Sequence, residues 1–476
     1  MNLKLVLNVI GRILFYFSFL FFLPIFVALY YSEEIYPFLK AFFITFLLGL
    51  ALLYLRPDVE FIKHREALAI VSLTWFSVAL VSSIPFILVG FNPIDAFFES
   101  MSGFTTTGAT IVDNIEGLPK SVLFWRSFIQ WLGGMGIIVL FLAIFPTMAK
   151  KGEILFFAEY PGVTLEKIKP RVKDVAIILY TIYLIYTFLE VSILHLLGVP
   201  IFDALLHTFT TLSTGGFSTH TKSIAYFNNP AIEAVIIIFM IIGGTNFALH
   251  YYLLREGKSP FRDTEFKVYI SVVAIASILI IISNLSSFGL YDSIRVSVFQ
   301  TVSILTTTGY TTTDFDKWSD FAKIILLILM IIGGCSGSTA GGIKIIRLYI
   351  LLKYSVLQIL KAAEPRIFRP IRYGDIILEK KIIDEIIAFT ILYILIFIVS
   401  SIIIVGSGYD ILTSISASAA TLGNVGPGMG LAGASESYSF FPVHIKLLLI
   451  LNMWIGRLEI FAVLALFIPH FWLRKW

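Results

Sequence analysis

Long apolar segments limit what this chain can fold into more than any other feature. A helix that crosses the hydrocarbon core of a bilayer needs about 20 mostly apolar residues. The first such segment lacks a small-residue cleavage site, so it is interpreted as a span and not as a signal peptide. The predicted fold class is an all-α polytopic membrane protein with ten transmembrane helices. They lie at roughly 9–30, 36–55, 67–90, 120–146, 175–198, 230–254, 267–288, 320–350, 382–406 and 442–468.

The composition and the placement of charge agree with this fold class. Only 14% of the residues are charged, whereas a soluble domain carries about 25%. Most of the 35 lysines and arginines lie at the two termini and in the loops at 56–66, 147–174, 255–267 and 347–381. Because basic residues concentrate on the cytoplasmic side of a membrane, we expect both termini and these loops to be cytoplasmic.

Four loops on the opposite, outer side share a pattern of hydroxyl residues around a glycine. In the clearest one, Leu305–Thr313, Gly309 lies among threonines, and the others are Thr105–Thr110, Leu212–Phe217 and Thr421–Gly426. Such loops can turn backbone carbonyls toward a potassium ion in place of its water shell. One loop supplies one side of such a cage, so four loops around one axis predict a central cation pore. Close packing of small residues is the alternative explanation for any single loop.

The last eight predicted spans divide into four units of span, loop and span. Aspartate is a favoured helix N-cap, so a short re-entrant helix is predicted between each of Asp95, Asp203, Asp292 and Asp410 and the glycine that follows it. The negative C-terminal ends of four such helices would attract a cation. The predicted division of the chain is a two-helix pair at 1–60, then pore repeats at 61–150, 151–255, 256–365 and 366–476.

Glycines also mark the second helix of each unit. The pairs Gly133-Gly134 and Gly243-Gly244 are interpreted as close helix packing, and Gly456 marks the fourth unit. The stretch Gly333–Gly342 is too rich in glycine to form a regular helix. A break in the middle of the eighth span is therefore predicted, below the pore.

Charged and polar side chains inside the predicted spans are candidates for function. Arg457 lies within the last span, where a charge is costly and is by default a functional candidate. A structural pair with a neighbouring helix is the alternative. For Lys344, snorkelling to the inner interface is an equally good explanation. Packing or hydrogen bonding is expected for Glu99 and His207.

The segment Gly334-Cys-Ser-Gly337 suggests a rival hypothesis, because it fits the Gly-x-Ser-Gly pattern of rhomboid intramembrane proteases. Ser336 would be the nucleophile and would need a histidine base, either His250 or His207. A four-residue pattern arises easily in a glycine-rich chain, so an enzyme is the less favoured hypothesis. The sequence has no zinc-ligand spacing, nucleotide-binding glycine loop or nucleic-acid signature, so neither an organic cofactor nor nucleic acid is expected.

As a set, these motifs resemble the Trk/Ktr/HKT superfamily of potassium transporters. The matching residues are Thr105–Thr110, Ser213–Ser218, Thr306–Thr311, Leu422–Pro427, Gly333–Lys344 and Arg457. The two additional N-terminal spans are similar to the TrkH branch, whereas the sodium-dependent KtrB-type members usually lack them. The resemblance implies potassium uptake across the cytoplasmic (inner) membrane by a homodimer with a cytosolic nucleotide-binding regulatory ring.

The resemblance also implies the site residues. One filter glycine would come from each loop, namely Gly108, Gly215, Gly309 and Gly423, and Leu422 stands where the other loops carry threonine. Potassium (or rubidium) would be bound mainly by the backbone carbonyls of Thr106, Thr107, Gly108, Ser213, Thr214, Gly215, Thr307, Thr308, Gly309, Thr421, Leu422 and Gly423. The gate would consist of Gly334, Cys335, Ser336, Gly337, Ser338, Thr339, Lys344 and Arg457.

Overall fold

The computed structural model describes residues 1–55, 62–136, 172–367, 369–374, 376–434 and 436–473. Six helices in this part of the chain are long and apolar enough to cross a membrane, and two bent helix pairs raise the number to eight. The all-α polytopic fold class is therefore confirmed. The end of the predicted span 120–146 and most of the predicted basic loops 56–66 and 147–174 lie outside the described residues.

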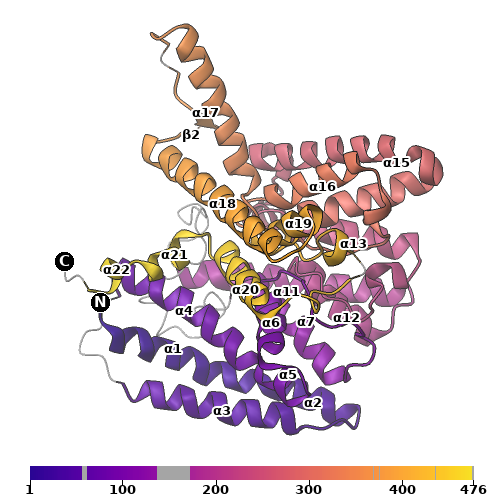
Figure 1. Ribbon diagram of the computed structural model, residues 1–476, viewed down its shortest axis with the longest axis vertical. Helices are drawn as coiled ribbons and strands as arrows, with labels where there is room; N and C mark the ends of the chain where they lie inside the picture. Colours follow the sequence, from indigo (N-terminus) through magenta and orange to yellow (C-terminus); the bar gives the residue numbers. More distant parts are fainter. Residues whose placement is uncertain (56–61, 137–171, 368, 375, 435, 474–476) are drawn as a thin grey trace.

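The N-terminal helix pair lies along one side of the bundle (Figure 1). Leu3–Ser18 (α1) continues through Phe19–Phe21 (η1) into Phe22–Tyr30 (α2), and Tyr36–Leu53 (α3) returns beside it. A Cβ atom added to Gly49 would lie 2.7 Å from the backbone nitrogen of Phe15, and one added to Gly11 would lie 2.6 Å from the Leu52 Cβ. The two helices can approach this closely only because both positions lack a side chain.

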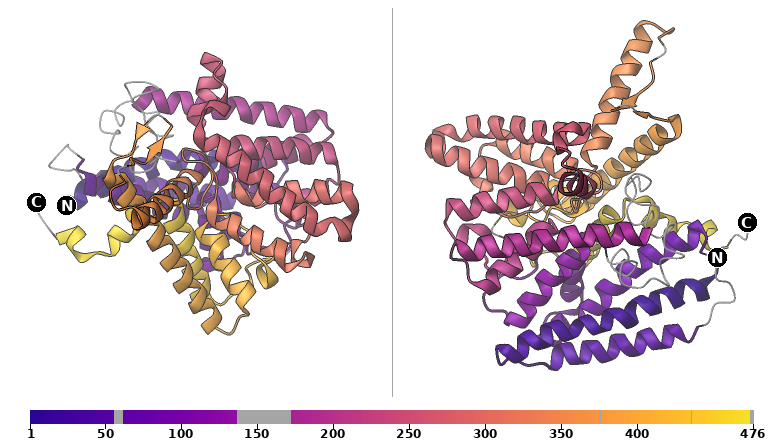
Figure 2. Two further views of the ribbon diagram at one scale, coloured as in Figure 1. Left: turned by 90° about the horizontal axis from the view of Figure 1, so that it is seen from above. Right: turned by 180° about the vertical axis from the view of Figure 1, so that it is seen from behind.

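The first and second units each contain long helices joined through a short one. Further short helices complete each unit, and the long helices of the two units lie side by side (Figure 2). The first unit consists of His64–Ser82 (α4), Ile84–Leu88 (α5), Pro93–Phe104 (α6) and Lys120–Gly134 (α7); the second consists of Val172–Leu196 (α11), Ile201–Leu212 (α12), Ser223–Tyr226 (η3), Pro230–Gly243 (α13) and Phe247–Glu256 (α14).

The fourth unit repeats the order of long helix, short helix and long helix, and the third unit differs because its first two helices are joined in α15. In α15 the first long helix and the short helix are joined across a kink at Gly289, which has φ 73°. The third unit consists of Pro260–Arg262 (η4), Thr264–Leu305 (α15), Phe315–Lys317 (η5), Asp320–Ile332 (α16) and Ile345–Ala363 (α17); the fourth consists of Arg372–Tyr373 (β1), Ile376–Ile377 (β2), Lys380–Gly406 (α18), Ile411–Leu422 (α19), Gly430–Ala432 (η6), Val443–Arg457 (α20), Phe461–Leu464 (α21), Ala465–Phe467 (η7) and Pro469–Leu473 (α22).

The short helices α6, α12 and α19 are each 12 residues long. Asp410 caps α19 by accepting a hydrogen bond from the Thr413 amide at 3.0 Å. Asp95 and Asp203 instead lie in the first turn, so the predicted N-caps are wrong in the first two units, where Asn92 and Pro200 precede the helices. Asp292 likewise lies inside α15. A carboxylate in a first turn still favours the positive end of the helix.

The second long helix of each unit stops at its glycine mark instead of crossing as a straight rod. The chain turns by 100° between α13 and α14 and by 118° after α20, so the uninterrupted spans predicted at 230–254 and 442–468 are wrong. A Cβ atom on Gly133, Gly243 or Gly456 would crowd the last carbonyl of α6, α12 or α19. These glycines let each helix reach the end of a short helix, which confirms the packing interpretation.

The eighth predicted span is broken, as expected. The helix α16 ends at Ile332, α17 begins at Ile345, and no helical turn joins them. Beyond the break, α17 projects from the body of the molecule (Figures 1 and 2). Ile350 of α17 packs with Ile371, Ile383 and Ile386, so the start of this helix is held against the first turns of α18 and the segment before it.

The packing of α1 on α3 gives a prediction about stability. Gly49→Ala should lower the free energy of unfolding by about 1–3 kcal/mol, because overpacking a tight contact costs this much. Gly406→Ala is the matched control, since no atom lies within 4 Å of its added methyl group. The melting temperatures of the parent and of both variants are measured in detergent. A Gly49→Ala variant that melts at the same temperature as the parent and the control would contradict the close contact.

Candidate ion pathway

The four hydroxyl–glycine loops meet in a closed ring although they are far apart in the sequence. In each loop a glycine faces a carbonyl oxygen of the next loop, and a Cβ atom at the glycine would collide with that oxygen. The glycine and carbonyl pairs are Gly108 with Gly215, Gly216 with Thr308, Gly309 with Val425, and Gly426 with Thr107. No side chain fits at these four positions.

The backbone conformation repeats in all four loops. The glycines that face the neighbouring carbonyls have φ values of 81°, 74°, 78° and 105° in Gly108, Gly216, Gly309 and Gly426. Two residues earlier stand Thr106, Thr214, Thr307 and Asn424, with φ values between 53° and 58°. Threonine is rarely found in this left-handed region. Such strain persists only where the surrounding structure imposes it, and it is concentrated at functional sites.

This repeat corrects the sequence assignment of two ring glycines. The positions equivalent to Gly108 and Gly309 are Gly216 and Gly426, not Gly215 and Gly423. Gly423 is the C-cap of α19, with φ −78°, and Thr421 and Leu422 are the last residues of that helix. Asp410 is the N-cap of α19, whereas Asp95 lies in the first turn of α6. The same distance from the aspartate that reaches Gly108 in the first loop therefore reaches only Gly423, at the end of the helix, in the fourth. Asn424, not Leu422, stands in the place of the strained threonines.

Two amide side chains that the sequence analysis missed hold the ring together. Asn424 Nδ2 donates to Thr107 Oγ1 at 2.9 Å and to the Met453 carbonyl at 3.0 Å, which joins the fourth loop to the first. Gln130 Nε2 donates to the Gly215 carbonyl at 2.7 Å, and its Oε1 accepts from the Phe217 amide at 3.0 Å. Gln130 could have been found as a polar residue inside an apolar span.

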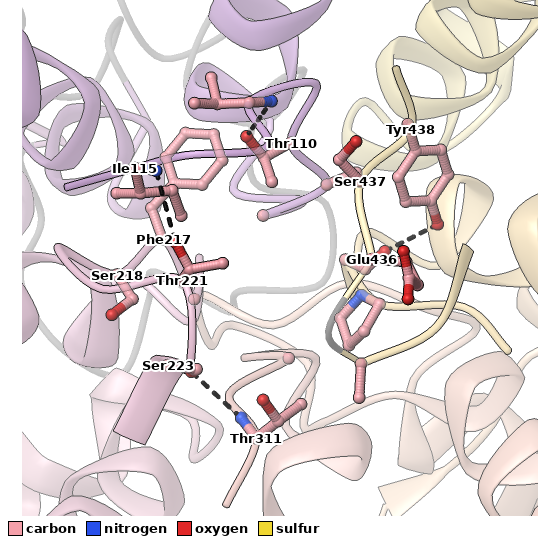
Figure 3. Close-up of a pocket in the computed structure, with 18 of the residues that line it drawn as sticks. Thr110, Ile115, Phe217, Ser218, Thr221, Ser223, Thr311, Glu436, Ser437 and Tyr438 are labelled. Atoms are coloured by element: carbon pink, nitrogen blue, oxygen red, sulfur yellow. Dashed lines mark hydrogen bonds between the residues drawn. The ribbon is translucent and has the colours of Figure 1, made fainter. Parts of the chain in front are cut away.

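A cavity of about 300 Å³ lies on one side of the ring, the side predicted to face outward (Figure 3). The four ring glycines and segments of all four units line it, with Asp113 and Glu436 among the polar residues. Arg126, which lines the cavity, forms a buried ion pair with Glu99 at 2.7 Å, and its Nη2 also donates to Thr110 Oγ1 at 3.2 Å. Glu99 thus has the hydrogen-bonding role expected from the sequence.

Histidines stand beside the same cavity. His207 bonds through its two ring nitrogens to the Asp203 carbonyl at 2.8 Å and to Ser218 Oγ at 3.0 Å, again as expected. Partial burial lowers the pKa of His220, and the nearby carboxylates of Asp203 and Glu116 only partly offset it. Burial opposes the ionisation of Glu116, but hydrogen bonds from Thr221 outweigh it and lower the pKa of this carboxyl. At neutral pH the outer wall therefore carries a neutral His220 beside an ionised Glu116.

The broken segment 333–344, the inner loop, lies directly beneath the ring. Its Gly341 amide donates to Thr307 Oγ1 at 2.8 Å, and Thr339 Oγ1 lies 3.2 Å from Thr214 Oγ1. Thr339 Oγ1 also donates to the Leu212 and Gly243 carbonyls at 3.0 Å. A separate and smaller cavity, of about 40 Å³, lies between the inner loop and the residues around Arg457.

Arg457 ties the inner loop to two other units. Its Nη1 donates to the Thr339 carbonyl at 2.6 Å, and its Nη2 donates to the Gly133 and Gly134 carbonyls at 2.6 and 2.9 Å. Thr339 lies in the break between α16 and α17, so its carbonyl has no partner within a helix and is free to bind this side chain. Arg457 is the last residue of α20, so its predicted place inside a continuous span was wrong.

The other residues assigned to the gate anchor the loop at several points. The Cys335 amide donates to the Gly244 carbonyl at 3.0 Å, the Phe247 amide donates to the Gly337 carbonyl at 3.0 Å, and Ser338 Oγ donates to the Cys335 carbonyl at 2.6 Å. Lys344 Nζ donates back to the Ala340 carbonyl, so this side chain is buried within the loop and does not snorkel.

The protease hypothesis lacks its catalytic pair. His250 bonds through Nδ1 to the Tyr186 hydroxyl at 3.2 Å and through Nε2 to the Ile242 carbonyl at 3.0 Å. Both ring nitrogens of His207 are also engaged, as described above. Neither histidine is hydrogen-bonded to Ser336 in the part of the chain that the structure describes, so no base is paired with the supposed nucleophile.

Comparisons with known proteins agree over the whole chain. The Trk system potassium uptake protein TrkH of Salmonella typhimurium is 38% identical, over 99% of this chain and 100% of the relative. The Trk system potassium uptake protein TrkG of Escherichia coli is 33% identical, over 99% of each chain. The crystal structure of the potassium transporter TrkH from Vibrio parahaemolyticus matches with a TM-score of 0.90 and 35% identity, over 99% of this chain and all of that one.

The family comparison leads to the same group of proteins. The sequence model of the TrkH family, described as cation transport protein, matches residues 35–473. The resemblance seen in the sequence motifs is thereby confirmed, and the family is one of transporters and not of enzymes. This chain belongs to the TrkH family of cation transport proteins.

Proposed function

We propose that this chain is the ion-conducting subunit of a potassium uptake system in the cytoplasmic membrane. The observation that carries the proposal is the ring of four glycines, each of which faces a carbonyl oxygen of the next loop. The relatives that match the full chain are named potassium uptake proteins. In this proposal both termini are cytoplasmic, as the basic loops predict.

The ring would act as the selectivity filter. Backbone carbonyls would replace the water shell of potassium, and they would come from the ring positions 106–108, 214–216, 307–309 and 424–426. The helices α6, α12, α15 and α19 all end at the ring, with C-caps at Thr105, Ser213, Thr306 and Gly423. Their negative ends favour a cation at the centre. The chain would perform no covalent chemistry and would need no organic cofactor.

The inner loop and Arg457 would form the gate. The loop supplies a steric block, and the guanidinium group stays ionised and supplies a positive charge. At about 6 Å and an effective dielectric near 20, this charge would repel a potassium ion by roughly 3 kcal/mol. Opening would require the loop to move aside and Arg457 to exchange its carbonyl partners.

The remaining alternative is a sodium-dependent subunit of the KtrB type. The N-terminal pair α1–α3 favours the TrkH branch, because KtrB-type members usually lack it. Rubidium uptake into liposomes that contain the pure protein tests the function directly. We expect uptake without added sodium, and strict sodium dependence would favour the alternative. A pH gradient in the same assay shows whether flux is coupled to protons.

We propose two partners for the inner face, a second copy of the chain and a cytosolic nucleotide-binding ring. Support comes from α17, which projects from the body and is attached directly to the inner loop. A partner that pulls on this helix could therefore move the gate. The basic residues near the helix would dock an acidic surface. They are Lys353, Lys361, Arg366, Arg369 and Arg372.

The filter proposal predicts a loss of selectivity in Gly309→Ser. The added side chain would collide with the Val425 carbonyl and must adopt φ 78°. Backbone strain of this kind costs on the order of 1–3 kcal/mol, so the potassium-to-sodium permeability ratio should fall by about tenfold. Gly406→Ser, in open space at the end of α18, is the control. An unchanged ratio in the Gly309 variant would falsify the assignment.

The gate proposal predicts a gain of flux in Arg457→Ala. Removal of the charge and of three hydrogen bonds should raise basal rubidium uptake, by up to about a hundredfold from the charge alone. Deletion of Cys335–Ser338 should also raise it. Arg12→Ala removes an exposed arginine of α1 and serves as the control. If both folded variants conduct no faster than the parent, Arg457 is a structural residue.

The docking proposal predicts weaker binding of the cytosolic ring when all five basic residues are changed to glutamine. Each exposed pair contributes up to about 1 kcal/mol, so the loss of five should reduce affinity by tenfold or more. Co-purification at low salt is the measurement. Lys317→Gln, on the predicted outer side, is the control, and undiminished co-purification would remove this surface from the interface.

A further inference from the structure

Glu265, in the first turn of α15, is a buried carboxylate that no sequence motif singled out. Its Oε1 accepts hydrogen bonds from the Ser336 amide at 2.7 Å and from the Ile346 amide at 3.2 Å. The first amide belongs to the inner loop and the second to the first turn of α17. One carboxylate therefore holds the loop and the helix that leaves it.

The position of Glu265 complements that of Arg457. Arg457 binds the loop through the Thr339 carbonyl, whereas Glu265 binds it through backbone amides. The Ile346 amide is one of the donors at a helix N-terminus that have no partner within the helix, and a negative charge there also favours the helix dipole. The loop is thus held between a guanidinium group on one of its carbonyls and a carboxyl group on one of its amides.

A neighbouring contact links Glu265 to the inner-face hairpin β1–β2. Asp263 caps α15 by accepting from the Phe266 amide at 2.9 Å, and its other oxygen accepts from the Tyr373 hydroxyl at 3.0 Å. The hairpin is also attached to α17, because Lys353 Nζ donates to the Arg372 carbonyl at 3.0 Å. Tyr373 therefore keeps α17 beside the start of α15, where Glu265 can reach both amides.

We propose that Glu265 is a positioning residue that holds the inner loop closed, and that the Tyr373–Asp263 bond keeps it in place. This inference rests on the proposed function, in which the inner loop is the gate. A partner that separates the hairpin from α15 would release the loop from the cytoplasmic end. The hairpin thus gives an inner-face partner a direct connection to a buried carboxylate.

The single cysteine of the chain provides a test that does not depend on flux. Cys335 lies in the inner loop with 1% of its surface exposed, so the rate at which a small methanethiosulfonate reagent modifies it reports release of the loop. In Glu265→Ala this rate should rise about tenfold, as expected for the loss of the acceptor of two buried amide hydrogen bonds. Glu265→Gln keeps an oxygen acceptor and should show a smaller increase.

Tyr373→Phe tests the hairpin with a mild change near the surface. It removes only the hydroxyl that bonds to Asp263, and it should also speed modification of Cys335. Tyr354→Phe is the matched control, because the Tyr354 hydroxyl on α17 makes no hydrogen bond within the described residues. A modification rate equal to that of the parent in folded Glu265→Ala and Tyr373→Phe would overturn the inference.

Rubidium uptake by the same variants separates this inference from the proposed gate. Faster modification of Cys335 with unchanged uptake would support Glu265 as the holder of the loop but would show that the loop is not the gate. Increased uptake in Arg457→Ala with an unchanged modification rate in Glu265→Ala would preserve the gate and overturn the role of Glu265.

Discussion

The contact between a glycine of one loop and a carbonyl oxygen of the next is the constraint on which the pathway depends. It occurs four times and closes a ring from segments that are hundreds of residues apart. The contact excludes every side chain, so each ring position must be glycine. It also requires an unusual backbone, which places three threonines and Asn424 in the left-handed region. Such strain persists only when the surrounding structure opposes its release.

The helices around the ring hold its strained backbone in place. The short helices α6, α12 and α19 have equal length, so they deliver their last carbonyls to the same level. Glycines in α7, α13 and α20 then let these helices meet the ends of the short ones. Side chains complete the support, with Gln130 behind the second loop and Asn424 across the first and fourth. The helices α7, α13 and α20 end close to these glycines, where they contact the short helices, and do not continue as straight spans.

Below the ring, a guanidinium group and a carboxyl group bind a segment without regular structure. A chain that leaves its helix inside a membrane exposes both donors and acceptors, and each needs a partner. Arg457 satisfies a carbonyl and Glu265 satisfies an amide of the inner loop, so side-chain hydrogen bonds of both kinds hold its middle, at Ser336 and Thr339. Such bonds are strong but can be exchanged for others, unlike a packed apolar core. This is the property that the proposed gate requires.

The sequence by itself determined the class of fold, the family and the approximate location of the pathway. Long apolar segments indicate membrane helices. Glycine-rich stretches, such as those near Gly309 and Gly333, indicate where a regular helix ends. The fold class and the helix ends could be predicted because both depend on the hydrophobicity and the glycine content of neighbouring residues. The aspartate of the fourth unit misled the assignment of Gly423, because Asp410 precedes α19 whereas Asp95 and Asp203 lie inside the first turns of α6 and α12.

Only the tertiary structure decided which residues form the ring and which hold the inner loop. Gly216 and Gly426 are identified as ring glycines only by the carbonyls of other units that they face. Glu265 and Ser336 are 71 residues apart, and Asn424 and Thr107 are 317 residues apart. No periodicity or spacing connects such pairs, because their contact is produced by the packing of four units around one axis and not by the local preferences of the chain.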